Sequence, residues 1–280
     1  MKITKIIALI MAVLMMALPL CSCLSQKGDG EETTADKSKT SDLAYVQKKG
    51  TLVIGMTEYP PMNYLDDNGE WTGFDTEFAN AVCEKLGVEA KFQIIDWKMK
   101  ETELKSYNID CIWNGLTVNE ERKLDMDFTQ SYLTNKQVVV AKADAGYTDA
   151  ASLSGAILSA EGGSAGETAI AADANLSKAT YSASATQTDA LLALVAGNAD
   201  AIIIDYTLAI ASCGTGAYAD LVILDGIQLA DEEYAIGFRL DSDMVEKVDD
   251  IIDELVADGT LSEIAAKYDL TERYEEALGK

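Results

Sequence analysis

The 280 residues of this chain include no histidine. The side chains left to carry chemistry are those with carboxyl, hydroxyl, thiol or aromatic groups. A Ser-His-Asp triad, a histidine-ligated zinc site and a histidine general base are therefore excluded. No two cysteines have the Cys-x-x-Cys spacing of a metal or redox site. The functions that remain possible are the binding of a small molecule and catalysis by carboxylate, thiol or tyrosine groups.

Two polar residues stand where apolar or glycine-rich segments end. Asp205 follows Ala201-Ile-Ile-Ile204, which reads as a buried strand, and a lone carboxylate in that place needs a partner. Capping of the segment that starts at Tyr206 is one alternative. Ser164 follows Gly163 at the start of a predicted helix, where free N–H groups and the positive helix end suit an anionic group.

Charge and composition narrow the function further. Acidic residues outnumber basic ones by 47 to 22, so the net charge of -25 would repel the phosphate backbone of a nucleic acid. Hydrophobic residues at 48% and charged residues at 25% are typical of a globular protein. At roughly 150 residues per domain, the length indicates two domains or lobes.

The first 23 residues have the layout of a bacterial export signal. An uncharged run over 6–20 follows a basic start, is too short to span a membrane comfortably, and precedes Leu20-Cys21-Ser22-Cys23, which resembles a lipobox. We predict Cys23 as the lipidated residue, because small Ser22 precedes it whereas bulky Leu20 precedes Cys21. Secretion without a lipid is the alternative. Residues 24–43 are polar and are predicted to be a flexible tether.

Three further cysteines, Cys83, Cys111 and Cys213, each stand in an apolar stretch. They permit at most one disulfide, and we expect free buried thiols.

Apolar periodicity and turn residues predict alternating strands and helices in the rest of the chain, which indicates an α/β fold. Strands are predicted over 50–55, 90–95, 109–113, 156–159, 201–204 and 234–238. Helices are predicted over 75–86, 100–106, 245–259 and 261–268, from Asn119, from Ser164 and around 191–195.

Eight short segments carry a further signal: Gly50-Thr-Leu-Val-Ile-Gly55, Tyr59-Pro-Pro61, Gly73-Phe-Asp75, the run from Ile109 to Arg122, Phe128-Thr-Gln-Ser-Tyr132, Gly163-Ser164, Gly197-Asn-Ala-Asp-Ala201 with Asp205, and Asp258-Gly-Thr260. In this order they resemble the extracytoplasmic amino-acid-binding proteins of ABC importers.

The resemblance covers about Lys49 to Tyr268 and implies a two-lobed periplasmic-binding-protein-like (Venus flytrap) fold. The resemblance implies that two crossing strands join the lobes and that hinge closure traps a ligand between them. It implies a first lobe of residues 44–137 and 232–280, a second lobe of residues 138–231, and neither a cofactor nor a metal.

The resemblance also implies how the ends of a zwitterion are held. Arg122 matches the family's arginine that grips a carboxylate in the pattern Thr-x-x-x-x-Arg, although without this pattern it would read as a solvated arginine. Thr117 is expected to offer its hydroxyl and N–H group, and Gly115 its carbonyl. Asp205 is expected to bind the ammonium.

Four further positions complete the site that the resemblance implies. Ser164 is expected to bind the carboxylate, and Ala165 stands where relatives often carry a second hydroxyl residue, which leaves only its N–H group. Tyr59 and Trp97 match rings that lie against the ligand's side chain, with core aromatics as the alternative reading.

We place Glu58 and Glu161 at the same end as the two rings, with no lysine or arginine. A second ligand carboxylate would meet no counter-charge there, so a polar or basic amino acid is expected in preference to an acidic one.

The sequence therefore predicts a lipid-anchored binding protein on the outer face of the cytoplasmic membrane. It would deliver a free amino acid to an ABC permease and its ATPase, and act as a monomer without nucleic acid. A catalytic member of the fold, such as a small-acid dehydratase with Glu58 or Glu161 as general acid, is one alternative. A ligand sensor is another, and would be expected to continue into a transmembrane helix and a signalling module.

Overall fold

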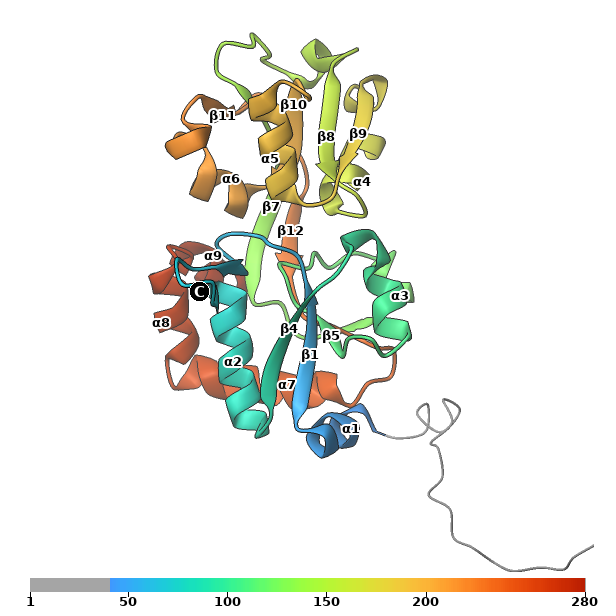
Figure 1. Ribbon diagram of the computed structural model, residues 1–280, viewed down its shortest axis with the longest axis vertical. Helices are drawn as coiled ribbons and strands as arrows, with labels where there is room; N and C mark the ends of the chain where they lie inside the picture. The colour runs from blue at the N-terminus through green and yellow to red at the C-terminus, as the bar shows by residue number, and fades with distance from the viewer. Residues whose placement is uncertain (1–40, 280) are drawn as a thin grey trace, which may run out of the picture. The chain divides into compact units, whose positions relative to one another are not determined.

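The computed structural model describes residues 41–279. The predicted export signal, the lipidated Cys23 and the tether up to residue 40 lie outside this range. Helices and strands alternate along the described chain, which confirms the predicted α/β class (Figure 1). None of the helices in this range combines the length and the apolar character that crossing a membrane requires.

The first lobe is built on a five-stranded sheet in the order β4-β1-β5-β13-β6, covered by helices and joined to a small β2–β3 hairpin. Its strands are β1 (Thr51–Met56), β2 (Tyr64–Leu65), β3 (Trp71–Thr72), β4 (Glu89–Ile94), β5 (Cys111–Ile112), β6 (Asp127–Phe128) and β13 (Gly237–Phe238). Its helices are α1 (Asp42–Lys49), α2 (Phe74–Leu86), α3 (Lys100–Lys105), α7 (Met244–Ala257), α8 (Thr260–Lys267) and α9 (Thr271–Ala277).

The second lobe is built on a sheet in the order β11-β7-β10-β8-β9, to which β12 adds by pairing with β7. Its strands are β7 (Leu133–Lys142), β8 (Ile157–Glu161), β9 (Thr180–Ser184), β10 (Ala201–Asp205), β11 (Leu221–Ile223) and β12 (Asp231–Tyr234). Its helices are α4 (Ala165–Ala172), α5 (Gln187–Ala196) and α6 (Tyr206–Ser212).

Strands β7 and β12 carry the chain between the lobes (Figure 1). They pair in antiparallel register from Leu133 opposite Tyr234 to Lys136 opposite Asp231. Beyond this point β7 continues into the second sheet, where it pairs with β10 and β11. The lobe boundaries expected from the resemblance, 137/138 and 231/232, fall within these two strands.

Helix α2 shows how the sequence builds the first lobe. Phe74, Phe78 and Val82 recur at four-residue spacing and are fully buried, so one helical face packs on the sheet. Phe78 meets Trp113 edge to face, with ring centroids 4.8 Å apart. Gly87 ends the helix in the left-handed conformation expected of a C-terminal glycine.

Two predicted elements differ from the structure. The helix predicted from Asn119 is only a short 3-10 turn, Arg122–Leu124. The Asn119 side chain caps this turn by accepting the Arg122 N–H at 2.8 Å, but β6 begins only three residues after the turn and leaves no length for a longer helix. The predicted strand over 234–238 is divided into β12 and β13, because the chain leaves one sheet for the other between them.

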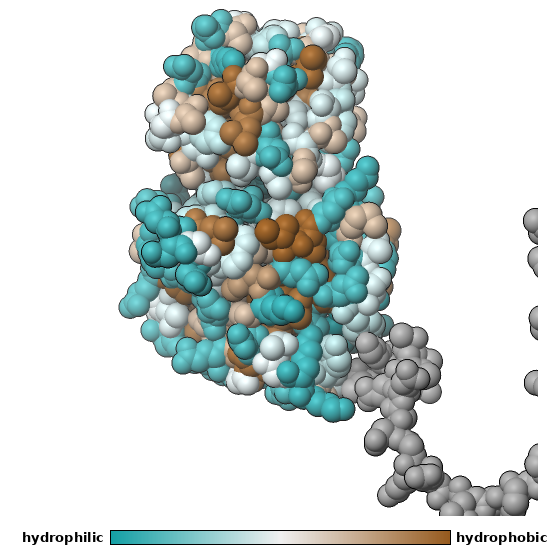
Figure 2. All heavy atoms as spheres, viewed as in Figure 1, coloured by the Kyte–Doolittle hydropathy of each residue, from teal (hydrophilic) through white to brown (hydrophobic). Residues whose placement is uncertain are grey.

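The folded chain also begins earlier than predicted. Helix α1 includes Asp42 and Leu43, and the Ser41 hydroxyl caps it by accepting the Ala44 N–H at 3.0 Å. The last residues of the predicted tether therefore belong to the first lobe. On the face drawn in Figure 2, charged and polar residues cover much of this lobe, with apolar areas between them.

The expectation of free thiols is confirmed. Cys83 and Cys111 are buried and Cys213 is half-buried, and none of the three forms a disulfide within the described range.

Candidate functional site

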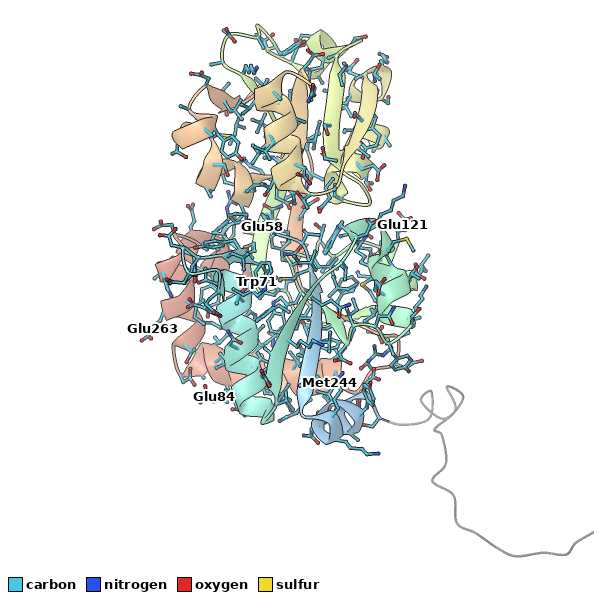
Figure 3. The ribbon with its side chains drawn as sticks, in the orientation of Figure 1. Glu58, Trp71, Glu84, Glu121, Met244 and Glu263 are labelled. Atoms are coloured by element: carbon cyan, nitrogen blue, oxygen red, sulfur yellow. The ribbon has the colours of Figure 1, made fainter. Side chains whose placement is uncertain are left out.

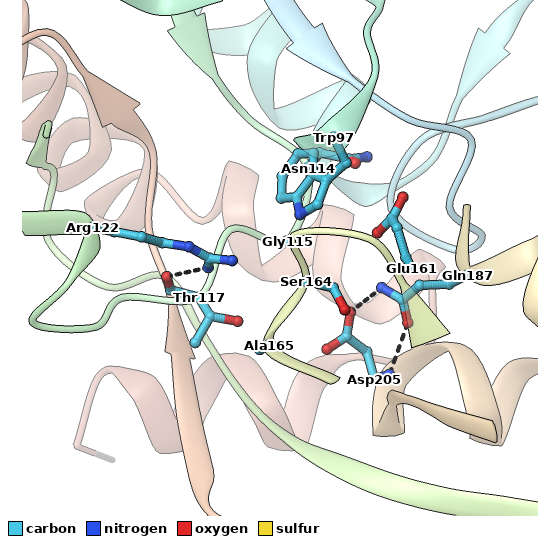
Figure 4. A pocket seen from close by; sticks show the side chains of 10 residues that line it. All are labelled: Trp97, Asn114, Gly115, Thr117, Arg122, Glu161, Ser164, Ala165, Gln187 and Asp205. Atoms are coloured by element: carbon cyan, nitrogen blue, oxygen red, sulfur yellow. Dashed lines mark hydrogen bonds between the residues drawn. The ribbon is translucent and has the colours of Figure 1, made fainter. Parts of the chain in front are cut away.

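A small cavity lies between the lobes, and residues from both line it (Figure 4). Eight of the ten predicted site residues belong to this lining, and Asn114 and Gln187 were not predicted. The lining consists of Trp97, Asn114, Gly115, Thr117 and Arg122 from the first lobe and Glu161, Ser164, Ala165, Gln187 and Asp205 from the second.

Arg122 provides the positive charge of the cavity. Its side chain is 7% exposed, and burial lowers the pKa of its guanidinium from the usual value. Nη1 donates to the Thr117 carbonyl at 2.7 Å, and Nη2 donates to the Gly163 carbonyl of the second lobe at 3.3 Å. The guanidinium has five N–H groups, so three remain for a ligand after these two bonds.

Gly115 and Thr117 follow the end of β5. The Gly115 N–H donates to the Asp75 carboxylate at 2.7 Å, and a Cβ on Gly115 would lie 2.7 Å from the Tyr59 ring. Only glycine fits here, because the residue also has a φ of +58°. The Thr117 hydroxyl was expected to face the ligand, but it donates to Glu232 on β12 at 3.1 Å.

Asp205 provides a negative charge from the second lobe and is 4% exposed. Its Oδ1 accepts from the Asn135 amide at 2.8 Å and from Gln137, and its Oδ2 accepts from Gln187. The hydroxyls of Tyr59 and Tyr234 are further hydrogen-bonding neighbours of this carboxylate. Burial raises the pKa of Asp205, while the amide bonds oppose that rise. Its side chain does not cap α6.

Glu232 on β12 is a further acid that the sequence analysis did not identify. Its Oε2 accepts from Thr117, from Asn135 at 3.1 Å and from Gln137 at 3.0 Å. Asn135 and Gln137 therefore bridge Glu232 and Asp205. Burial and the neighbouring Asp205 charge raise the pKa of Glu232 to about 7.

Glu161 ends β8 and is 2% exposed. Its Oε1 has no hydrogen-bond partner among the described residues. Burial, and to a lesser degree the Asp205 charge, raise the pKa of Glu161 to about 8. Glu161 and Arg122 lie on opposite sides of the cavity (Figure 4).

Ser164, Ala165 and Trp97 occupy the places that the sequence predicted. The Ser164 hydroxyl caps α4 by accepting the Glu167 N–H at 3.2 Å. Ala165 is the first residue of α4, so its N–H group belongs to the free N–H groups at the positive helix end. The Trp97 indole is buried and lines the cavity.

Tyr59 and Glu58 do not line the cavity, contrary to prediction. Tyr59 is a core ring behind Gly115, and its hydroxyl hydrogen-bonds to that of Tyr234 at 2.8 Å. Neighbouring side chains in extended backbone point to opposite sides, so an inward Tyr59 turns Glu58 outward. The Glu58 side chain is exposed, and its carbonyl accepts from Thr188 of the second lobe at 3.4 Å (Figure 3).

The two lining residues that were missed are polar groups at element ends. Asn114 follows β5, and its side chain bonds to Thr57 and Asn63. Gln187 opens α5 directly after the capping Thr186. A polar residue beside an apolar run was the signal available for both.

A second contact closes the cavity beside Arg122. The buried Lys100 ammonium donates to the Gly163 carbonyl at 3.0 Å and to the Trp97 carbonyl at 3.4 Å, and it pairs with Glu101 at 3.1 Å. Within residues 41–279 no cluster of three or more cysteine, aspartate or glutamate side chains could hold a metal ion. The arrangement suits a small zwitterion: a guanidinium on one wall and a carboxylate on the other.

Comparison with known proteins agrees with this chemistry. Residues 52–271 match the model for bacterial extracellular solute-binding proteins, family 3. The chain is 29% identical over 258 residues to the L-cystine-binding protein TcyJ of Escherichia coli K12, covering 90% of this chain and 92% of that one.

Two solved structures have the same two-lobed fold. The structure of Tv2483 bound to L-arginine has a TM-score of 0.75 and 29% identity, over 81% of this chain and 93% of that one. An ancestral amino acid-binding protein, described as a precursor of cyclohexadienyl dehydratase, has a TM-score of 0.73 and 26% identity, over 81% of this chain and 99% of that one.

Proposed function

Because the chain belongs to the bacterial extracellular solute-binding proteins of family 3, we propose that it captures a free amino acid and delivers it to an ABC transporter permease and its ATPase. One observation carries the proposal: Arg122 of the first lobe and Asp205 of the second line the same cavity. An amino acid bears a carboxylate and an ammonium on one carbon atom. A closed site must pair both charges, and these two residues can do so.

The bonds already made by each residue indicate the ligand's orientation. The ligand's carboxylate would meet the three remaining Arg122 N–H groups and the free N–H groups at the start of α4. Its ammonium would meet the carboxylate of Asp205 and the Gly115 carbonyl. Its side chain would then extend towards Glu161 and Trp97.

We expect a polar or basic amino acid in preference to glutamate or aspartate. Asp205 and Glu161 line the cavity opposite a single lining guanidinium, so a second ligand carboxylate would have no counter-charge. The relatives named for L-cystine and L-arginine support an amino acid as the ligand class.

Calorimetry with the twenty amino acids, on protein unfolded and refolded to remove bound cargo, tests the proposal. Mass spectrometry of the material released on unfolding identifies any natural ligand. We expect saturable binding of at least one amino acid without its conversion. Absence of binding by all twenty, with no amino acid in the released material, would contradict the function.

A catalytic role is the second candidate, supported by Glu161. A buried carboxyl group with a pKa of about 8 stays protonated at neutral pH and could donate a proton. The same calorimetric samples, analysed for new products after prolonged incubation, distinguish the two. Accumulating product would favour an enzyme.

We further propose that Cys23 carries a lipid that holds the protein on the outer face of the cytoplasmic membrane, as a monomer near its permease. The support is the lipobox-like sequence before Leu24. Cys23→Ala should release the protein into the medium. Retention of this variant, together with release of Cys21→Ala, would move the anchor to Cys21.

A further inference from the structure

The carboxyl group of Glu161 is buried in the wall of the cavity without a partner for one of its oxygens. Its Oε1 is enclosed and makes no hydrogen bond among residues 41–279. An unpaired buried carboxyl group is costly, and such groups are retained where something else supplies the donor.

The ammonium of Lys100, which lies close to Glu161, makes its contacts with other groups. The three N–H groups of Lys100 go to Gly163, Trp97 and Glu101. The Thr57 hydroxyl donates to Asn114 at 2.9 Å and is also the one side-chain hydrogen-bonding neighbour of the Glu161 carboxyl group among the described residues, which still leaves Oε1 without a partner.

The two lining amides are equally committed. Asn114 donates to the Thr57 carbonyl at 3.0 Å and to Asn63 at 2.7 Å, and the Gln187 amide donates to Asp205. A ligand in the cavity could therefore supply the donor that Glu161 Oε1 lacks.

The charges around the cavity specify what kind of donor fits. Around the cavity the two cations, Arg122 and Lys100, are outnumbered by the acidic groups of Glu101, Glu161, Asp205 and Glu232. Without a ligand Glu161 keeps its proton at neutral pH, and a cationic group beside it would favour its ionised form. A zwitterion adds equal and opposite charges and leaves this imbalance unchanged. A ligand with a further cationic group reduces it.

We propose that Glu161 is the specificity-determining residue of the site and binds the ammonium or guanidinium group of a basic amino acid. Glu161 lies across the cavity from Arg122, at the end to which the side chain of a ligand gripped by Arg122 and Asp205 extends (Figure 4). This inference rests on the proposed function and narrows its ligand to amino acids with a cationic side chain.

Arginine and citrulline test the inference, because they have nearly the same shape and differ in side-chain charge. Wild-type protein should bind L-arginine at least tenfold more tightly than L-citrulline in calorimetry. In Glu161→Gln the ratio should fall to threefold or less, mainly through weaker arginine binding. Glu58→Gln is the matched control, since Glu58 is exposed at the lobe border and should leave the ratio unchanged.

The outcomes separate the two proposals. If the wild type binds citrulline or glutamine as tightly as arginine and lysine, the role of Glu161 is wrong, whereas the amino-acid-binding function stands. The same holds if Glu58→Gln narrows the ratio and Glu161→Gln does not. If no amino acid binds, the proposed function itself fails. The ratio of arginine to citrulline affinity is first measured on the wild-type protein. The inference can therefore be contradicted even if Glu161→Gln folds poorly.

Discussion

The Lys100 ammonium of the first lobe donates a 3.0 Å hydrogen bond to the Gly163 main-chain carbonyl of the second lobe. Arg122 donates to the same carbonyl at 3.3 Å. Lys100 is only 3% exposed, and burial lowers the pKa of its ammonium. Two cations of one lobe thus meet a single carbonyl of the other, beside the cavity, and hold the closed arrangement.

Replacing Lys100 with methionine keeps the length of the side chain and removes its donors. A hydrogen bond to a charged group contributes about 1.5–3 kcal/mol, so ligand dissociation should become about tenfold faster. Stopped-flow measurement of Trp fluorescence would report this rate. Lys98→Met, an exposed lysine two residues earlier, should leave it unchanged. Equal dissociation rates in all three proteins would show that Lys100 does not hold the lobes together.

Gly163→Ala should weaken ligand binding more than folding. Gly163 has a φ of +77°, and an added Cβ would lie 3.0 Å from the Lys98 Cα across the cleft. We expect at least tenfold lower affinity in calorimetry. Gly197→Ala is the matched control, because Gly197 has a φ of +75° with no atom within 4 Å. Both variants should lose about 1 kcal/mol of stability to backbone strain, but only Gly163→Ala should lose affinity.

Arg122→Ala and Asp205→Ala should each weaken amino-acid binding at least tenfold. Each leaves one charge of the closed complex unpaired, at a cost of about 2–5 kcal/mol. Calorimetry on variants with wild-type circular dichroism would measure the loss. Near-native affinity in either variant would show that the replaced residue does not bind the ligand.

The pH dependence of stability should show the titration of Asp75, whose carboxyl group is fully buried beneath Gly115. Burial raises its pKa to about 7, although hydrogen bonds from Gly115 and Tyr132 partly oppose the rise. The folded protein therefore holds a proton that the unfolded chain releases near pH 4. The stability gained is fully present below about pH 4 and is lost as the pH rises through 7, with a slope of up to about 1.4 kcal/mol per pH unit.

Asp75→Asn removes this titration. The decline in the free energy of unfolding between pH 5 and pH 8 should be shallower in Asp75→Asn than in the wild type, as measured by urea denaturation. Asp67→Asn, at an exposed position in the β2–β3 hairpin, should follow the wild type. Parallel curves for all three proteins would mean that Asp75 is not the group responsible.

The sequence predicted the position of a site residue correctly where that position depends only on the residue's own strand or helix. Asp205 ends a strand whose residues are all buried, so its carboxylate had to lie at the end of the sheet near the cavity. Ser164 caps a helix whose start was evident from the glycine-rich turn before it. The resemblance to a family added Arg122, which its acidic neighbours alone would have assigned to the surface.

What the sequence could not predict depends on contacts between distant segments. Tyr59 matched a ligand-facing ring, yet its hydroxyl finds Tyr234, 175 positions along the chain. Glu232 lies on a strand of alternating exposure and becomes important only because β12 pairs with β7 beside Asn135. The periodicity of apolar residues in the sequence does not predict such contacts between distant segments.

The attachment of α1 determines which part of the molecule is fixed. Asp42 forms a buried ion pair with Arg239, and the Leu43 N–H donates to Asp243 at 2.9 Å, so the chain entering at Ser41 is fastened to the base of the first lobe, at the end away from β7 and β12 (Figure 1). A pull on the amino terminus would therefore load the first lobe alone. With the lipid proposed on Cys23, the second lobe could swing and release a ligand without doing work against that anchor.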